Sequence, residues 1–344
     1  MALNNNFVDT IYVVILNYNS WQDTIECVES LLNSTYKNFQ IILLDNKSPN
    51  DSEKKIRHYF EGSIDTQINA SFFNAKIKKR NAPLPYKFYN NENAHTEIVL
   101  NESIKSNFLK YPIIFIQTNE NLGFAGGNNV ALNVLLSATI PDRAKVFLLN
   151  PDTFIETNCL EELSQITNDF FIAGCAIKKY EDPLKLSFYG GYRFFKPFGI
   201  IRPITNLRNR NKVDYIYGGA LLTNIQTLRK NGLLPSEYFL YWEETDWSYK
   251  AQRESIELFL AEKAVVYDKV GTSTGRGYLA HYYYIRNGLK FYSKYLKHYL
   301  PTLIAFNVLR FLNKLRKGEW QSAKAIFDGS KDYFRGKEGY TPIG

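Results

Sequence analysis

The sequence predicts an α/β fold, with a doubly wound and mainly parallel sheet that is followed by a C-terminal helical region. Apolar residues occur in continuous runs, which is typical of strands covered on both faces. Stretches with helical character separate these runs, as they do in βαβ units. A polar or glycine-rich loop follows each of the first four runs. A chain of 344 residues is long enough for one large domain with an appendage, or for two domains.

The predicted elements follow one another regularly in the first half of the chain. The first apolar run leads into Ser20-Trp-Gln-Asp23, which is similar to a capping box with Asp in place of Glu and predicts a helix to about Leu32. The other elements are strands at 11–17, 39–45, 112–117 and 145–149, a helix at about 51–60, and a glycine-rich turn at 121–129 that opens a helix. Right-handed crossovers then place the ends of all these strands at one edge of the sheet.

The alternation stops between residues 62 and 111. This stretch is polar and Asn-rich without sustained periodicity, so we interpret it as an insertion that its aromatic residues partly order. After Asp152 the pattern is mixed, with an apolar run at 170–177, an aromatic loop at 186–199 and a further apolar segment at 213–223.

Composition argues against several classes of protein. Hydrophobic residues make up 45% and charged residues 22%, as in ordinary folded proteins. Cys27, Cys159 and Cys175 form no CxxC pair, which argues against a zinc site or a disulfide framework and favours a reducing compartment. No basic segment precedes the first apolar run, and no stretch reaches the roughly 18 to 20 apolar residues of a spanning helix. We therefore expect a cytoplasmic protein.

Polar or glycine-rich groups follow four successive strands. Asn17-Tyr18-Asn19 ends the first, Asp45 ends the second, residues 121–129 follow the third, and Asn150-Pro151-Asp152 ends the fourth. Asn-Pro and Pro-Asp are also ordinary turn formers, so one acid alone could mark a plain turn. Four such groups at the edge where open α/β sheets bind ligands predict a nucleotide site. The first loop lacks GxGxxG, which disfavours a dehydrogenase.

The ordered series VVILNYNS, ILLDNKSPNDS, NENLGFAGGNN, FLLNPD, YGGALLT and FLYWEETDWSYKAQ resembles the motifs of family 2 glycosyltransferases. It is most similar to the rhamnosyltransferase-like and galactofuranosyltransferase-like branch. The likeness runs from about Ile11 to Thr274 apart from the insertion, and residues 281–295 and 320–339 resemble the tail of that branch. It implies a GT-A catalytic domain over 1–275, with the insertion at about 62–111, and a basic, aromatic helical region over 276–344.

The same resemblance implies an inverting, metal-dependent enzyme. It would move rhamnose from dTDP- or UDP-rhamnose to a bacterial surface glycan or a polyprenol-linked acceptor. Galactofuranose or another hexose carried by UDP is the alternative donor sugar. The enzyme would be cytoplasmic, or peripheral at the inner face of the cell membrane.

The resemblance also implies a set of donor-binding residues. Those for the donor nucleotide are Asn17, Tyr18, Asn19, Asp45, Gly123, Gly127, Asn128 and Asn150. Asp45 would accept a hydrogen bond from a pyrimidine N3–H, with a turn cap as the alternative interpretation. Gly123, Gly127 and Asn128 would let the backbone approach the sugar nucleotide, with a plain helix entry as the alternative.

Two carboxylates are implied as metal ligands. Asn150-Pro151-Asp152 stands where many family members have Asp-x-Asp, so Asp152 is the carboxylate that remains. Relatives place a His after a late strand, in a pattern like VYHKGG, and Asp268 stands at that position here. Carboxylates together with diphosphate oxygens suit Mg²⁺ or Mn²⁺. A surface turn is the alternative interpretation of Asp268.

The motif Glu243-Glu244-Thr245-Asp246 supplies the candidate catalytic acids. Direct displacement at a sugar carbon needs a base to accept the proton of the attacking hydroxyl. Glu244 stands at the position of the family's base, and Asp246 is the second candidate. Acids in the first turn of a helix also suit its dipole, which is the plainer explanation for one of them.

The C-terminal region carries much of the formal charge of +8. Lys and Arg are frequent from 290 to 337 among aromatic residues, so a nucleic-acid-binding protein is the alternative class, although no nucleic-acid-binding motif accompanies them. Apolar residues recur at intervals of three in this region: Leu303, Phe306, Leu309, Leu312 and Leu315. We interpret them as one helical face beside Lys314, Arg316 and Lys317, which predicts contact with an anionic membrane surface. Packing on the core or in a homodimer is the alternative.

Overall fold

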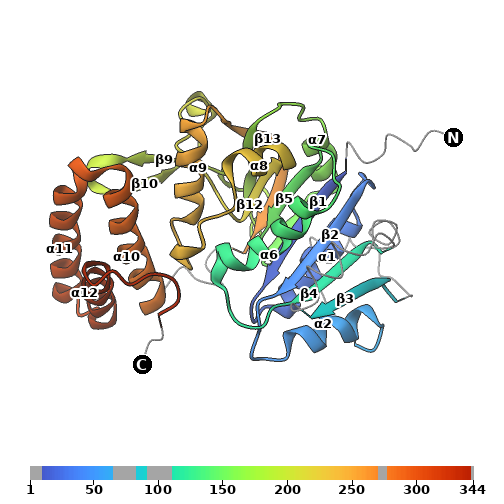
Figure 1. Cartoon of the computed structure of the whole chain (residues 1–344), viewed down its shortest axis with the longest axis horizontal. Helices are drawn as coiled ribbons and strands as arrows, with labels where there is room; N and C mark the ends of the chain where they lie inside the picture. The colour runs from blue at the N-terminus through green and yellow to red at the C-terminus, as the bar shows by residue number, and fades with distance from the viewer. Residues whose placement is uncertain (1–9, 65–82, 91–110, 270–276, 342–344) are drawn as a thin grey trace.

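The computed structural model describes residues 10–64, 83–90, 111–269 and 277–341, and it confirms the predicted α/β fold (Figure 1). Within these ranges a ten-stranded sheet has the order β3-β4-β2-β1-β5-β12-β7-β13-β6, with β8 paired to β7. Its strands are β1 (Ile11–Asn17), β2 (Phe39–Asp45), β3 (Tyr86–Asn90), β4 (Ile113–Gln117), β5 (Lys145–Leu149), β6 (Thr153–Ile155), β7 (Phe171–Lys179), β8 (Leu186–Phe188), β12 (Ala220–Asn224) and β13 (Glu257–Asp268). The five strands from β3 to β5 are parallel, whereas β12 runs antiparallel to both of its neighbours.

Helices cover both faces of this sheet. They are α1 (Trp21–Leu32), α2 (Ser52–Phe60), α6 (Gly123–Ser137), α7 (Cys159–Ser164), α8 (Ile225–Asn231) and α9 (Glu243–Arg253). Ile11, Val13 and Ile15 of β1 pack with α1, α2 and α7, while Tyr12 and Val14 pack with α6, α8 and α9. Both sets of side chains are buried, which explains why the strand is apolar at every position.

The insertion predicted over 62–111 contributes a strand to the sheet. Tyr86–Asn90 forms β3, which lies at the edge and pairs in parallel with β4. The rest of the predicted insertion, at 65–82 and 91–110, lies outside the described residues.

The aromatic loop predicted over 186–199 is wrong as a description of this segment, because most of it is strand. It contains β8 and β9 (Gly191–Phe195), and β9 pairs with β10 (Ile200–Pro203) and β11 (Tyr215–Ile216) in a small antiparallel sheet. Phe194 is buried while Arg193 and Phe195 are exposed, so the strand alternates in the ordinary way. Aromatic residues on both faces hid this alternation in the sequence.

The predicted C-terminal helical region is present. It consists of α10 (Tyr278–Tyr295), α11 (Leu300–Arg316) and α12 (Trp320–Phe334), and in Figure 1 α10 lies between α9 and α11. One buried cluster joins this region to the main body, and we call it the aromatic junction. Its buried members are Phe194, Tyr238, Trp242, Ile285, Leu289, Phe291, Tyr292, Leu296, Leu303 and Ile326. The members of the junction come from both sides of the domain boundary that the sequence predicts at 275/276. The boundary itself stays a prediction.

The apolar residues of α11 do not form the single face predicted from their spacing. Leu303 is buried in the aromatic junction, whereas Leu309 and Leu312 are exposed. A step of three residues turns a helix by about 300°, so the stripe moves around α11 by about 60° at each step. Among the described helices, none combines the length and apolar character needed to cross a bilayer.

Candidate active site

The parallel register brings the polar strand ends together at one edge. Asn17 lies opposite Asp45, and Asp45 lies opposite Gln117. The Asp45 carboxylate is fully buried and accepts hydrogen bonds from Asn17 Nδ2 at 2.6 Å, Ser48 N–H at 3.1 Å and Gln117 Nε2 at 3.2 Å. Asp45 is therefore the centre of a preformed network that joins the ends of three strands.

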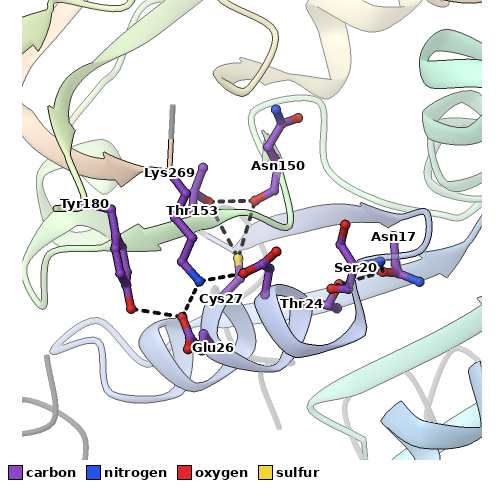
Figure 2. A network of polar contacts seen from close by, with 10 residues as sticks. Asn17, Ser20, Thr24, Glu26, Cys27, Asn150, Thr153, Tyr180 and Lys269 are labelled. Atoms are coloured by element: carbon purple, nitrogen blue, oxygen red, sulfur yellow. Dashed lines mark hydrogen bonds and ion pairs between the residues drawn. The ribbon is translucent and has the colours of Figure 1, made fainter. Parts of the chain in front are cut away.

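The Asn17 carboxamide also orients the start of α1. Its Oδ1 accepts hydrogen bonds from Ser20 N–H at 3.1 Å and Thr24 Oγ1 at 2.9 Å, at the helix entry shown in Figure 2. The capping box predicted at Ser20 and Asp23 is wrong, because the Ser20 hydroxyl makes no capping bond and donates to the Tyr18 carbonyl. Asn17 makes the bond to the helix start instead.

The loop after β1 is held against the loop after β2. Asn19 has a left-handed backbone with φ 60°, and its N–H donates to Ser48 Oγ at 2.9 Å. Its carbonyl accepts from Asn50 Nδ2 at 3.0 Å. Tyr18 is 43% exposed, so the fixed loop presents an aromatic ring at the edge of the sheet.

Packing accounts for the glycines predicted to approach the donor. Gly123 has φ +71°, and a Cβ there would lie 2.2 Å from the Phe239 carbonyl oxygen. A Cβ on Gly127 would lie 2.6 Å from Leu16 Cδ1, so this glycine lets α6 approach β1. Asn128 is buried and donates from Nδ2 to the Phe124 carbonyl at 2.9 Å. The glycine-rich turn predicted at 121–129 belongs largely to helix α6, which begins at Gly123.

Asp152 and Asp268 form a buried pair of carboxylates. Each is 5% exposed, and Asp268 lies opposite Thr153 in the pairing of β13 with β6. Burial, and after it the negative charge of Asp152, raises the pKa of Asp268 to about 6. The Tyr217 hydroxyl donates to Asp268 Oδ2 at 2.8 Å. Asp268 is thus an interior group and not part of a surface turn.

The donor set of this pair fits a hard divalent cation in part. Both ligands are carboxylates, and two like charges in a buried site favour a cation between them. The residues that the structure describes contain no group of three or more His, Cys, Asp or Glu side chains that could hold a metal ion. Further ligands would therefore have to come from a bound diphosphate or from water.

Lys269 fixes the end of β13 next to Asp152. Its Nζ lies 2.6 Å from Asp23 Oδ1 and 2.6 Å from Glu26 Oε2, and the Tyr180 hydroxyl donates to the same Glu26 oxygen at 3.0 Å (Figure 2). The Lys269 N–H donates to the Asp152 carbonyl at 3.1 Å. Burial opposes the charged form of Lys269, but the two carboxylates outweigh it and raise its pKa. No motif in the sequence indicates this anchor, because its members are far apart in the chain.

Asn150 joins β5 to its neighbours mainly through its backbone. Its N–H donates to the Gly219 carbonyl at 2.9 Å, and its carbonyl accepts from Thr153 Oγ1 at 2.7 Å. Figure 2 shows the carboxamide of Asn150 pointing away from the network around Cys27. Burial raises the pKa of the Cys27 thiol to about 12, so Cys27 is a neutral core residue.

Glu244 lies at the start of α9, beside the loop that contacts Asp268. A Cβ built on Gly218 would lie 3.6 Å from Glu244 Cβ, and the preceding residue, Tyr217, donates to Asp268. Burial raises the pKa of Glu244 to about 7. Burial and then the charge of Glu244 hold the pKa of Glu243 well above its ordinary range. Among the described residues, Oε2 of Glu243 and of Glu244 has no hydrogen-bond partner.

Tyr192 lies near both Glu244 and Asp268. Burial raises its pKa, and the charges of Glu244 and Asp268 raise it further. Its ring stacks on Tyr215 with centroids 4.9 Å apart, and it meets Tyr217 edge-on at 6.3 Å. Tyr192 and Tyr217 therefore pack together near the carboxylate pair, and Tyr192 also lies near the predicted base. Sequence reasoning missed both tyrosines, although each stands in a Gly-Gly motif, GGYRFF or YGGALLT.

Asp246 belongs to a separate network. It is 2% exposed and accepts hydrogen bonds from the hydroxyls of Tyr238 at 2.6 Å and Tyr295 at 2.9 Å. Lys294 Nζ forms an ion pair with it at 2.8 Å. Three donors, two of them from α10, thus satisfy this carboxylate, which joins α9 to the C-terminal helices.

The segment that leads into α9 has an unusual backbone. Phe239, Tyr241 and Trp242 have φ values of 66°, 64° and 78°. Left-handed conformations cost an L-residue roughly 1–2 kcal/mol each, and bulky side chains rarely adopt them. Surrounding contacts must therefore hold this segment in place.

The N-terminal part of the chain is similar to a known protein family. Residues 12–79 match the family described as Glycosyl transferase family 2. The low-salt glycan biosynthesis hexosyltransferase Agl10 of Haloferax volcanii is 27% identical over 150 residues, which are 42% of this chain and 48% of that protein. The chain therefore spans about half the length of this curated relative.

Two solved structures share the fold over most of the chain. One is the mannosyltransferase PcManGT from Pyrobaculum calidifontis in complex with GDP-Man and Mn²⁺, with a TM-score of 0.51 at 10% identity. The match covers 94% of this chain and 86% of the PcManGT chain. The other is GalNAc-T7 with UDP, GalNAc and Mn²⁺, with a TM-score of 0.52 at 13% identity. This match covers 86% of this chain and 49% of the GalNAc-T7 chain. At these identities the likeness shows the fold alone. The chain is thus similar to glycosyltransferase family 2 over part of its length, and it shares a GT-A-like fold with these two solved structures.

Proposed function

We propose that this protein transfers a sugar from a nucleotide donor to an acceptor hydroxyl with inversion at the sugar carbon. One observation carries the proposal. The Tyr217–Gly219 loop contacts both the candidate base and the carboxylate pair: Gly218 lies against Glu244, and the Tyr217 hydroxyl donates to Asp268, whose pKa is raised in part by Asp152. A base and a pair of carboxylates that could hold a cation, and through it a diphosphate, suit a direct displacement at a nucleotide-linked carbon.

The donor we propose is a pyrimidine nucleotide carrying rhamnose, as dTDP- or UDP-rhamnose. Asp45 would accept the N3–H of the base, in exchange for the Gln117 amide, whose bond to Asp45 is the longest of the three at 3.2 Å. The exposed ring of Tyr18 would stack on the base, and Asn17 and Asn19 would fix the loop around it. The ordered motifs support rhamnose, while UDP-galactofuranose or another UDP-hexose is the alternative, in keeping with the hexosyltransferase name of the relative.

We propose that Asp152 and Asp268 hold Mg²⁺ or Mn²⁺ together with oxygens of the donor diphosphate. The two carboxylates provide the hard oxygen ligands that such ions prefer. When bound, the ion would neutralise the charge that develops on the departing diphosphate. Lys269 would keep the pair in place through its contacts with Asp23 and Glu26. Gly123, Gly127, Asn128 and Asn150 would line the same edge through their backbone.

Glu244 is the base that we propose for the acceptor hydroxyl. A general base works best when its pKa lies near the working pH, and burial raises the pKa of Glu244 to about 7. Asp246 already accepts bonds from Tyr238, Lys294 and Tyr295. We therefore assign to Asp246 the task of holding α9 against α10.

The acceptor we propose is a bacterial surface glycan or a polyprenol-linked glycan, presented at the inner face of the membrane. The outer faces of α11 and α12 are apolar, with Leu309 61% and Phe327 56% exposed, and an apolar cleft of about 330 Å³ lies between the helices. Arg316 and Lys317 are exposed at the end of α11. Apolar side chains next to cations suit an anionic lipid surface. A homodimer through the same faces is the alternative.

A nucleic-acid-binding function has less support. Phe291 and Tyr292, two of the aromatic residues in the basic segment, are fully buried, and no nucleic-acid-binding motif accompanies the exposed Trp320, Phe327 and Phe334. Buried rings cannot act as stacking platforms for bases.

A panel of nucleotide sugars tests the proposed function. The protein would be mixed with UDP-, dTDP- and GDP-linked sugars and Mn²⁺, and hydrolysis of each donor and the change in Tm would be measured. We expect a UDP- or dTDP-linked sugar to raise Tm and to be hydrolysed slowly, with Asp152→Ala as the matched inactive control. If no donor raises Tm or is hydrolysed, the proposal is wrong.

A further inference from the structure

Asn287 of α10, a wholly buried side chain, bonds to the strained segment before Glu244, and Arg286 Nη2 also donates to the Tyr238 carbonyl at 3.2 Å. Asn287 Nδ2 donates to the carbonyls of Tyr238 at 2.7 Å, Leu240 at 2.7 Å and Tyr241 at 3.1 Å. Asn287 is 0% exposed. An amide has two hydrogens, so at least one of them is shared between two carbonyls.

The other carbonyls of this segment are also satisfied. The Phe239 carbonyl accepts from the Phe124 N–H of α6 at 2.8 Å, and the Trp242 carbonyl accepts from the Asp246 N–H within α9 at 2.8 Å. Asn287 differs from these two backbone donors, because its side chain donates to more than one carbonyl of the segment. Buried carbonyls need such partners, and loss of the Asn287 amide would leave Leu240 and Tyr241 without the bonds described above.

The residues next to Asn287 fix its orientation and distance. Arg286 Nε donates to Asn287 Oδ1 at 3.0 Å, which turns the amide nitrogen toward the carbonyls. Gly288 lets the helix approach Trp242, since a Cβ at this position would lie 2.9 Å from Trp242 Cζ2. The Trp242 indole donates to the Tyr284 carbonyl at 2.9 Å. Three successive residues, Arg286, Asn287 and Gly288, thus form a clamp on residues 238–242.

We propose that this clamp positions the catalytic base. Trp242 is the N-cap of α9, and Glu244 is the second residue of that helix. The left-handed conformations of Phe239, Tyr241 and Trp242 set the direction in which α9 starts, and so the place of the Glu244 carboxylate. The clamp makes α10 a part of the active site although it does not touch the substrate. This inference rests on the proposed function for its catalytic consequence, whereas the clamp itself can be tested without turnover.

The test compares Asn287→Ala with Asn307→Ala. Asn307 is a second buried Asn in the helical region, whose Oδ1 accepts from Arg310, so the two variants remove the same atoms from the same region. Hydrogen exchange of the amides from 239 to 246 would be measured together with donor binding and kcat. We expect Asn287→Ala to speed exchange in this segment and to lower kcat by about 10²-fold, the effect of a displacement of about 1 Å, with donor binding unchanged. We expect Asn307→Ala to change neither the exchange nor kcat.

Two results would overturn the proposal. One is an unchanged exchange rate at 239–246 in Asn287→Ala. The other is a loss of kcat that follows the loss of Tm equally in both Asn variants. Should Asn287→Ala not fold, Gly288→Ala provides the same test, because its added methyl group displaces Trp242 and leaves Asn287 intact. Failure of the parent protein to turn over any donor would count against the proposed function, and the exchange measurement would still decide the clamp.

Discussion

Glu244→Gln should make the protein less active and more stable at the same time. A general base contributes at least ~10²-fold to turnover, so with Glu244 as the proposed base kcat should fall by that factor while donor binding stays. In the parent, activity should rise with pH through about 7, because the base works only when deprotonated. The acid limb should be absent from the residual activity of the variant.

The stability effect follows from the direction of the pKa shift. Burial raises the pKa of Glu244 from its ordinary 4.5 to about 7, so the folded protein binds this proton more tightly than the unfolded chain. The stability due to this proton is fully present below about 4.5 and is lost as pH rises from there through about 7. At about 1.4 kcal/mol per pKa unit, the ionised Glu244 costs on the order of 3 kcal/mol at pH 8. Glu244→Gln removes that cost at pH 8 and changes little at pH 4.5.

Denaturant unfolding at the two pH values measures this difference. Glu254→Gln, at the exposed C-terminal end of the same helix, is the matched control and should be neutral at both. Equal stability of Glu244→Gln and the parent at pH 8 would refute the burial argument. Retained turnover in Glu244→Gln, together with its loss in Asp246→Asn, would move the base to Asp246.

Further predictions concern the donor, the metal and the surface. Asp152→Ala should abolish the Mn²⁺-dependent part of donor binding in calorimetry, and full activity in EDTA would contradict the metal role of both Asp152 and Asp268. Asp45→Ala should weaken UDP binding by about 1.5–3 kcal/mol, the value of a hydrogen bond to a charged group, and should leave GDP binding as it is. The parent should float with anionic vesicles at low salt and less at high salt, and Leu309→Glu should reduce flotation. A parent protein that stays in solution at low salt would contradict the membrane surface and leave the chemistry untouched.

The sheet could be predicted from the sequence because its strands are buried on both faces. Such strands are apolar at most positions, so β1, β2 and β5 match the predicted runs residue for residue. The same regularity predicted that Asn17 and Asp45 lie side by side. The local order of apolar and polar residues along the chain was enough to predict these strands and this pairing.

The rest of the site depends on contacts between distant parts of the chain. Lys269 is more than 240 residues from Asp23 and Glu26, and Asn287 is nearly 50 from the carbonyls that it binds. A single Lys or Asn has no spacing that indicates such partners. The motif that made Asp246 the second candidate likewise gives no sign of its tertiary contacts with Lys294 and two tyrosine hydroxyls. The spacing of apolar residues alone also cannot show whether they lie on one face of a helix or turn around it, as those of α11 do.

The aromatic junction limits how this enzyme can be altered. Because Phe194, Trp242 and Phe291 pack together, α10 cannot be exchanged for the corresponding helix of another transferase without disturbing the β9 strand and the start of α9. On the outer faces of α11 and α12, exposed residues such as Leu309 and Trp320 are not members of the junction. Engineering of acceptor choice or surface attachment should therefore begin on those two faces, where substitutions can accumulate without reaching Glu244.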